Sequence, residues 1–427
     1  MNKPTFSITP RAAARVRFAA ILGVLGPGLV SGFADNDAGG ITTYSVAGVK
    51  YGYELLWVLL ASQIVLFFTQ EVGARLGLAT GQGLTGLVRE RFGVRWVTFL
   101  TITMLIANVG SIVAEFAGTA AALSLFNVPP AVSAALAAGV VIALLTRGSF
   151  SKVQYLFVAV GICVSLAYFA SALMSQPDWG KALSSLLVPS GSGKAAYWLA
   201  VVATVGTTIT PWGQAFIQSY CADKRLGPED LVGERLDVGL GALLTNLIAG
   251  FIVVACASAL WSHNVAIDTG NPSAVADIAK ALSPLAGEGA TVLFAIGLLA
   301  ASFLGLGVVP LTSAYAACEA FGWETGVEWR WREAPAFYGL MIFFVVFAAL
   351  FVLVFPKNSL VQLMLTAQMV NCILLPFVLV FVMRLSADKK LMGPLVSGRF
   401  MLTIGWLGTA LLVFLCAVLV ATSFVAF

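Results

Sequence analysis

Two aspartates, Asp35 and Asp37, lie two residues apart inside the first long apolar stretch of the chain. Near the centre of a bilayer each charge costs ~2.5–3.5 kcal/mol, so such residues are normally functional. The two side chains diverge on a regular helix, but on an extended backbone they can face one cavity. Carboxylates suit hard cations. The pair therefore predicts a site for a divalent cation within the membrane, with Asp37 the stronger candidate.

Two apolar stretches are interrupted by residues that break helices. The first contains Gly26-Pro27-Gly28 and the run from Asp35 to Gly40, and the sixth contains Pro211 among several threonines. Irregular backbone at membrane depth is tolerated only where it is buried in protein or lines a cavity. Interrupted first and sixth spans are typical of two inverted five-helix repeats with a substrate site between them. A proline kink in one span and a flexible hinge in the other remain the simpler alternative.

The composition indicates a polytopic membrane protein. Of 427 residues, 59% are hydrophobic and 10% are charged, and the mean hydropathy is +0.95. We expect one transmembrane domain over residues 1–427, with repeat one at about 18–175, repeat two at about 196–383 and an extra helix at about 400–425. The eleven expected spans are 18–48, 52–76, 96–125, 131–146, 153–175, 196–221, 237–262, 290–317, 335–356, 359–383 and 400–425.

Lysine and arginine residues are distributed unequally between the two sets of loops. With the N-terminus in the cytoplasm, the opposite side holds only Lys50, Lys181, Lys194, Lys280 and Lys357 of the 24 Lys and Arg residues, and none falls within a span. This pattern predicts a multi-pass protein of the plasma membrane with a cytoplasmic N-terminus and an extracellular C-terminus. The net charge of +4 then reflects topology and predicts no nucleic-acid partner.

Several short motifs resemble the Nramp divalent-metal transporters, over nearly the whole chain. They are Gly26-Pro27, Asp37-x-Gly39, Lys50-Tyr-Gly-Tyr53-x-Leu-Leu-Trp57, Ala114-Glu115-Phe116-x-Gly118, Pro211, and Gln368 with Pro376. The resemblance implies an all-α, LeuT-type fold of eleven helices, with the ion held between the unwound parts of helices one and six. It also implies transport rather than catalysis, and we expect a monomer in the lipid bilayer.

The departures from the family pattern bear on the identity of the ion. Nramp helix one reads Asp-Pro-Gly-Asn, where this chain has Asp37, Ala38 and Gly40, and helix six reads Met-Pro-His, where it has Thr210-Pro211-Trp212. The thioether that favours transition metals is absent, which leaves an all-oxygen site suited to Mg²⁺ and to some extent Mn²⁺.

Mg²⁺ keeps several of its waters, for which the missing side chains would leave room. These changes resemble the Nramp-related magnesium transporters. The expected ligands are Asp37, Asp35, carbonyls near Gly206 and Thr207, and the side chains of Thr210, Gln214 and Gln368. The expected cavity lining is Trp212, Gly40, Asn371 and Glu115. Mg²⁺ or Mn²⁺ is the expected substrate, and no bound cofactor is expected.

Proton coupling, which the resemblance would imply, lacks several of its residues. The single histidine, His263, falls in an external loop, Trp212 replaces the histidine of helix six, and Ile112 replaces the first acid of helix three, which leaves Glu115 alone. A divalent ion gains ~4.6 kcal/mol per 100 mV, so the membrane potential can drive uptake without protons.

Two transporter alternatives remain open. They are a proton-coupled Mn²⁺/Fe²⁺ transporter of the Nramp type and a sodium-coupled symporter of organic solutes with the same fold. An intramembrane enzyme is disfavoured, because the sequence has no His-Glu-x-x-His or Gly-x-Ser-x-Gly motif.

Overall fold

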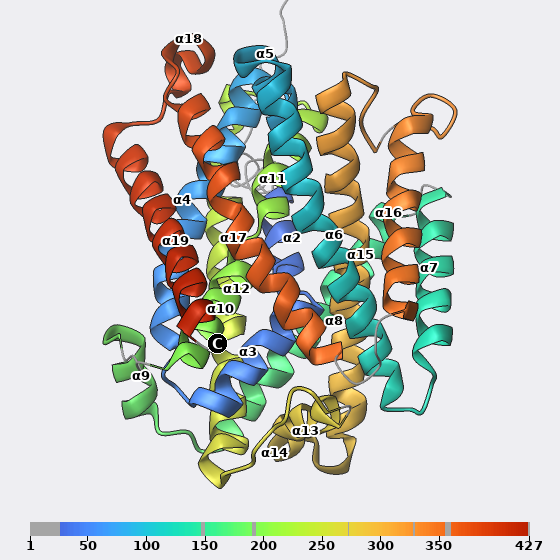
Figure 1. Ribbon diagram of the computed structural model, residues 1–427, viewed down its shortest axis with the longest axis vertical. Coiled ribbons are helices and arrows are strands. Elements are labelled where there is room, and N and C mark those ends of the chain that lie inside the picture. Colours follow the sequence, from blue (N-terminus) through green and yellow to red (C-terminus); the bar gives the residue numbers. More distant parts are fainter. Residues whose placement is uncertain are drawn as a thin grey trace, which may run out of the picture.

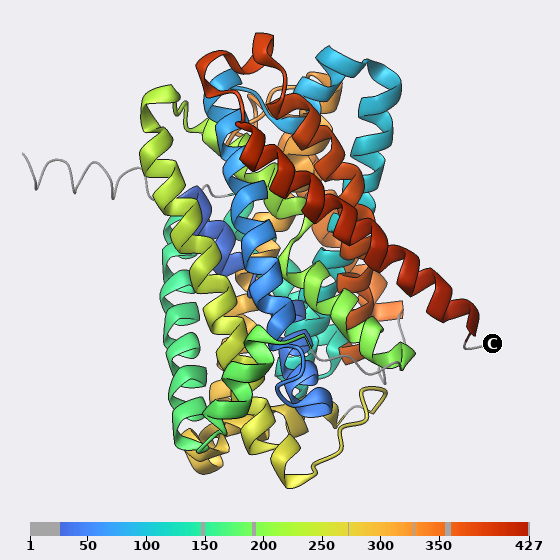
Figure 2. The ribbon, with the colours of Figure 1, turned by 90° about the vertical axis from the view of Figure 1, so that its left-hand side faces the viewer.

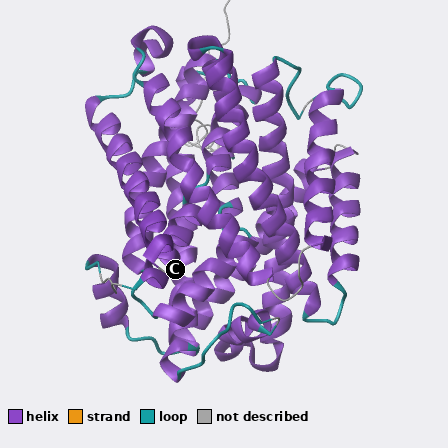
Figure 3. Cartoon of the chain, in the orientation of Figure 1, coloured by secondary structure: helices purple, strands orange, loops and turns teal. Residues whose placement is uncertain are grey.

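The computed structural model describes residues 26–146, 150–189, 194–271, 273–327, 329–354 and 360–425. Every regular element in these ranges is a helix, as Figures 1 and 3 show. The first part of the expected first span, residues 18–25, lies outside the described residues, as does Lys357. We call the two ends of the bundle the α5 end, at the top of Figure 1, and the α9 end, at the bottom.

The helices follow the expected spans closely. The first half of the chain forms α2 (Pro27–Ala34), α3 (Ala38–Tyr51), α4 (Leu56–Thr80), α5 (Leu84–Phe92), α6 (Val94–Ser124), α7 (Pro130–Thr146), α8 (Phe150–Met174) and α9 (Trp179–Leu187). The second half forms α10 (Ala195–Thr208), α11 (Pro211–Asp223), α12 (Leu231–Ala259), α13 (Ala274–Ala279), α14 (Ser283–Ala286), α15 (Ala290–Phe321), α16 (Pro335–Val354), α17 (Leu360–Ser386), α18 (Lys389–Met392) and α19 (Arg399–Val425).

The class of polytopic membrane protein is confirmed by the length and composition of these helices. Within the described ranges, seven helices are long and apolar enough to cross a membrane. The two interrupted spans add α2 with α3 and α10 with α11, whose halves are too short to cross alone. Large apolar side chains such as Ile106, Phe343 and Phe414 are exposed on the outer surface, as expected of helices that face lipid. Figure 2 shows α19 running obliquely along the outside of the bundle.

The expectation that no Lys or Arg falls within a span is wrong for Arg75. This residue lies in α4, is buried, and forms an ion pair with Glu71 one turn earlier. Arg235 of α12 donates from Nε to the same Glu71 carboxylate at 2.7 Å. A buried cation is tolerated here because a carboxylate on the same helix compensates its charge.

The short helix α2 is held against α12 by contact between glycine backbones. A Cβ built on Gly241 would lie 2.6 Å from the carbonyl carbon of Gly28, and one built on Gly32 would lie 2.6 Å from the carbonyl oxygen of Gly241. Asp237 of α12 accepts hydrogen bonds from the N–H groups of Gly28 and Leu29, which caps the first turn of α2 from a neighbouring helix. This contact fixes the half-helix that ends at the two aspartates.

Replacing Gly241 by alanine is therefore expected to destabilise the protein, although Gly→Ala inside a helix usually stabilises. Overpacking of this kind typically lowers the free energy of unfolding by ~1–3 kcal/mol. Replacing a glycine inside a helix by alanine raises it by ~1 kcal/mol through the higher helix propensity of alanine. Gly250→Ala in the same helix is the matched control, because a Cβ there meets nothing within 4 Å. Thermal unfolding in detergent should rank the midpoints as Gly250→Ala at or above the unmodified protein and Gly241→Ala below both. Equal midpoints for the two variants would contradict this packing.

Candidate metal-binding site

The first break lies between α2 and α3, where Asp35, Asn36 and Asp37 separate the two half-helices. Asp37 has an extended backbone and is the N-cap of α3, and its Oδ1 accepts a hydrogen bond from the Gly40 N–H. Aspartate is among the best N-cap residues, so the sequence itself explains why α3 starts at this point. The side chain is 1% exposed, so the carboxylate lies deep in the bundle.

Asp35 joins the first break to the second. Its Oδ1 accepts a hydrogen bond from the Thr210 hydroxyl at 3.2 Å, and its Oδ2 has no protein hydrogen-bond partner within the described ranges. Thr210 is in turn the N-cap of α11, accepting from the Gly213 N–H at 3.1 Å, and Pro211 occupies the first helical position. Two spans that are 175 residues apart in sequence thus meet through one carboxylate.

The end of α10 leaves one backbone oxygen without its usual helical partner at the second break. The Thr207 carbonyl would normally bond the N–H of residue 211, but proline has none, so this oxygen is free to face a ligand. Thr207 Oγ1 is also buried without a hydrogen-bond partner among the described residues. The C-terminal end of a helix carries partial negative charge, so the ends of α2 and α10 both favour a cation.

Helix α17 packs against both breaks through Gln368. The Gln368 carbonyl lies directly on Gly206 of α10, where a side chain would clash with backbone, and the Gln368 Nε2 lies directly on Gly39 of α3. Asn371 donates to Gln368 Oε1 at 2.9 Å and to Ser111 of α6 at 3.0 Å. Asn371 therefore orients the Gln368 amide and joins α17 to α6.

Glu115 of α6 approaches the break from another side. Its Oε2 accepts a hydrogen bond from the Ala38 N–H at 3.3 Å, and its carboxyl group faces that of Asp37. The second oxygen, Oε1, has no hydrogen-bond partner in the described part of the chain. Gly305 of α15 makes room for this side chain, because a Cβ there would lie 2.5 Å from the Glu115 carboxyl carbon.

Buried polar atoms without protein partners concentrate around the two breaks. Within the described ranges they include Asp35 Oδ2, Thr207 Oγ1, both amide atoms of Gln214, Trp212 Nε1, Glu115 Oε1 and Gln368 Nε2. Leaving such atoms unsatisfied costs roughly 1–3 kcal/mol each, so their concentration makes the two breaks the candidate site for a ligand. Gln214, Trp212 and Gln368 are 0% exposed, so solvent does not reach these residues.

The structure changes one expectation about this site and adds residues to it. A Cβ at Gly40 would lie 2.9 Å from the Asp35 carbonyl oxygen and 3.2 Å from Thr207 Oγ1, so protein oxygens occupy the room expected there for water. Sequence reasoning missed Gln70 of α4, which lies beside Asp35 and donates to Ser31 at 3.3 Å. An amide inside an apolar helix was its only signal.

Acidic, cysteine and histidine side chains alone do not make this site. No group of three or more such side chains in the described residues is arranged to hold a metal ion. A cation here would therefore need neutral oxygens from threonine, glutamine and backbone groups beside the aspartates. Such hard donors favour Mg²⁺, Ca²⁺ and Mn²⁺ over softer ions.

Comparison with known proteins decides the family. A family model described as "Natural resistance-associated macrophage protein-like", or Nramp, matches residues 28–422. The chain belongs to the Nramp family. It is 28% identical to a divalent metal cation transporter, MntH, of Deinococcus radiodurans over 422 residues, covering 95% of this chain and 92% of that protein. It is 30% identical to the MntH of Acidiphilium cryptum over 69% of each chain.

Solved structures confirm the LeuT-type fold of this Nramp protein. The crystal structure of a manganese transporter mutant from Eremococcus coleocola superposes with a TM-score of 0.75 at 19% identity, covering 97% of this chain and 87% of that one. MhsT in complex with L-phenylalanine superposes with a TM-score of 0.64 at 15% identity, covering 94% of this chain and 98% of that one. The relatives are named as transporters, in agreement with the expectation that the chain is not an enzyme.

Proposed function

We propose that this Nramp protein is a uniporter for divalent metal cations, with Mg²⁺ as its main substrate and Mn²⁺ as a second. Its relatives are named divalent metal cation transporters. The observation that carries the proposal is that, among the unpartnered buried atoms around the two breaks, those able to donate electron pairs to a cation are oxygens. Asp35 Oδ2, Thr207 Oγ1 and Gln214 Oε1 have no protein hydrogen-bond partner among the described residues.

One methionine near these helices is already engaged by a hydrogen bond. Met364 lies one turn before Gln368 in α17, and its Sδ accepts a hydrogen bond from Thr42 of α3 at 3.5 Å. Thr210 occupies the position that the family gives to methionine, and it presents a hydroxyl. A site with these donors favours a hard, partly hydrated ion.

We further propose that the α5 end faces the cytoplasm and that the plasma membrane is the location. The short helices α5 and α18 at this end carry Arg89, Arg91, Lys389 and Lys390, as the positive-inside rule requires of cytoplasmic segments. The N-terminus would then be cytoplasmic and the C-terminus extracellular. The division into two inverted repeats and the monomeric state remain predictions from the sequence.

Transport without protons is the mechanism that we propose. At 100 mV a divalent cation gains ~4.6 kcal/mol, which sustains about a thousandfold gradient. In proteoliposomes with a negative interior, Mg²⁺ uptake should proceed against an opposing gradient of about tenfold, while an internal dye reports constant pH. Uptake should stop when an ionophore removes the potential. Acidification in proportion to the metal that enters would sink the idea.

Proton-coupled Mn²⁺ or Fe²⁺ transport is the second candidate, and the contact between Glu115 and Asp37 is the observation that favours it. The same vesicles separate the two candidates. If coupling exists, internal acidification should accompany Mn²⁺ uptake and disappear in Glu115→Gln. Sodium-dependent binding of an organic solute would instead support the symporter alternative. The similarity of fold is the observation in favour of that alternative.

A further inference from the structure

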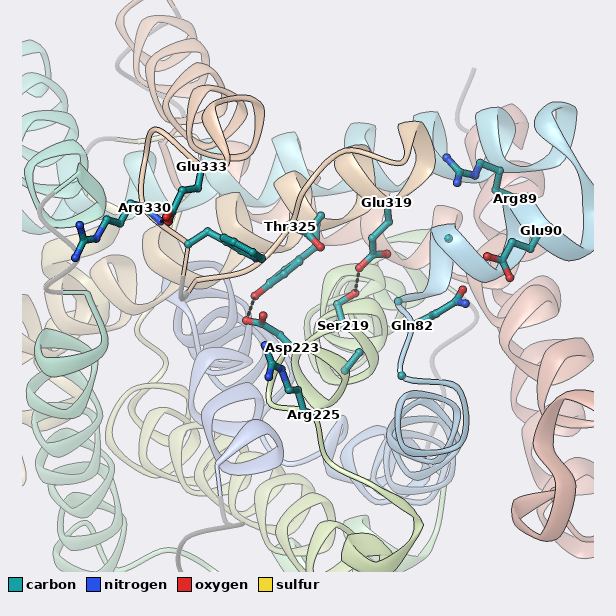
Figure 4. A pocket seen from close by; sticks show the side chains of 16 residues that line it. Gln82, Arg89, Glu90, Ser219, Asp223, Arg225, Glu319, Thr325, Arg330 and Glu333 are labelled. Atoms are coloured by element: carbon teal, nitrogen blue, oxygen red, sulfur yellow. Dashed lines mark hydrogen bonds between the residues drawn. The ribbon is translucent and has the colours of Figure 1, made fainter.

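A cavity of about 720 Å³ opens at the α5 end of the molecule (Figure 4). Its walls come from the ends of α11 and α15, the turn between α4 and α5, and the loop before α16. Charged side chains such as Arg89, Arg225 and Glu333 line it, whereas Ser219 and Glu319 lie together near its centre in Figure 4. None of the proposed ion ligands lines this cavity.

Glu319 connects three helices where the cavity meets the bundle. Its carboxylate accepts hydrogen bonds from the hydroxyls of Ser219 in α11 at 2.7 Å and Thr85 in α5 at 3.0 Å. The backbone N–H groups of Thr85 and Gly86 also donate to it, so a residue of α15 caps the start of α5. Gly83 lies directly against the carboxylate, so a larger residue there would displace the Glu319 side chain.

About one and a half helical turns separate this contact from the ion site. Gln214, one of the proposed ligands, lies five residues before Ser219 in α11, which corresponds to ~7.5 Å along a helix. Gln218 lies in α11 between Gln214 and Ser219. It is 0% exposed, and it donates from Nε2 to the Gln82 carbonyl at 3.1 Å. Its Oε1 has no hydrogen-bond partner in the described ranges.

We propose that Glu319 with Ser219 and Thr85, here called the Glu319 clasp, is the gate that closes the ion site on the α5 side. The inference rests on the proposed transport function. When the clasp and the hydrogen bond between Gln218 and Gln82 both break, the ion site becomes continuous with the cavity. The ion can then leave toward the α5 side. Glu319 is a positioning residue in this scheme, because it acts by holding α11 against α5.

Accessibility of a cysteine in the site tests the clasp. Gln214→Cys is introduced into a chain whose six native cysteines are replaced, and a small membrane-impermeant thiol reagent is added from the α5 side. Ser219→Ala or Glu319→Gln is expected to raise the labelling rate at least about fivefold, since each removes hydrogen bonds that hold α11 to its neighbours. The matched control is Glu333→Gln, which changes a carboxylate of the same cavity whose hydrogen bond among the described residues is to the N–H of Arg330 in its own loop. It should leave the rate unchanged.

Two further measurements separate gating from general loosening. Cys256 of α12 is 0% exposed in the core, and in a chain that keeps only this cysteine its labelling should not rise in either clasp variant. In the chain without the reporter, Mn²⁺ affinity should stay within about twofold. Unchanged labelling of Gln214→Cys, or a parallel rise at Cys256, would overturn the gate. Absence of metal uptake by the unmodified protein would instead contradict the proposed function. The labelling rates would still show whether the clasp controls access to residue 214.

Discussion

Asp37→Asn is expected to abolish uptake and binding of Mg²⁺ and Mn²⁺. Asparagine is as good an N-cap as aspartate, so the hydrogen bond from the Gly40 N–H survives and α3 still starts at the same residue. What is lost is one of the two carboxylates at the break, the one that is the stronger candidate ligand. Loss of an outer partner of a metal site typically costs ~10–100-fold in affinity, and loss of a carboxylate ligand should cost more.

Asp178→Asn is the matched control for this prediction. Asp178 is the N-cap of α9 and accepts a hydrogen bond from the Lys181 N–H at 3.0 Å, so the same substitution is made at the same kind of position, far from the site. Radiotracer uptake and calorimetric binding should show normal values for Asp178→Asn and none for Asp37→Asn. Metal binding by Asp37→Asn with unchanged affinity would remove this residue from the ligand set.

Thr210→Met should reverse the preference of the site between hard and soft ions. The substitution introduces a thioether, which favours softer transition metals. It also removes the hydroxyl that caps α11 and donates to Asp35, and loss of such a cap typically costs ~1 kcal/mol. We expect Cd²⁺ to compete with Mn²⁺ uptake at least about tenfold better than in the unmodified protein, and Mg²⁺ to compete less well.

Thr210→Leu isolates the contribution of the sulfur. Leucine at position 210 removes the same hydroxyl as methionine and is similar to methionine in size, but it supplies no donor atom for a metal ion. Competition curves for Cd²⁺ and Mg²⁺ against Mn²⁺ should therefore shift toward Cd²⁺ only in Thr210→Met. If both variants shift alike, the cause is the lost hydroxyl, and ligand softness at this position does not select the ion.

Local chemistry explains why the two breaks could be predicted. Proline at residue 211 and the Asp-Asn-Asp run before α3 determine where helical hydrogen bonding stops, whatever surrounds them. The apolar lengths of the spans likewise follow from the thickness of the bilayer. The positions of Asp35, Asp37, Thr207 and Thr210 near one another follow from pairing these breaks.

Contacts between helices explain what the sequence left open. The buried pairing of Arg75 with Glu71 involves Arg235 from a helix far along the chain, and Gln70 gains its place beside Asp35 only when α4 packs on the first break. The space around Gly40 was overestimated for the same reason. Its filling by the Asp35 carbonyl depends on how the backbone turns between α2 and α3, which residue types alone do not give.

Engagement of one oxygen on each aspartate limits the denticity of the site. Asp37 Oδ1 is bonded to the Gly40 N–H, and Asp35 Oδ1 is bonded to the Thr210 hydroxyl. Asp35 therefore has one oxygen without a hydrogen-bond partner among the described residues, which favours monodentate coordination, and the Asp37 carboxyl group also faces Glu115. Ca²⁺ takes six to eight oxygens and often a bidentate carboxylate, whereas octahedral Mg²⁺ is content with one or two carboxylates and several waters. If the proposed site binds a cation, the two caps that start α3 and α11 should therefore also disfavour the larger ion.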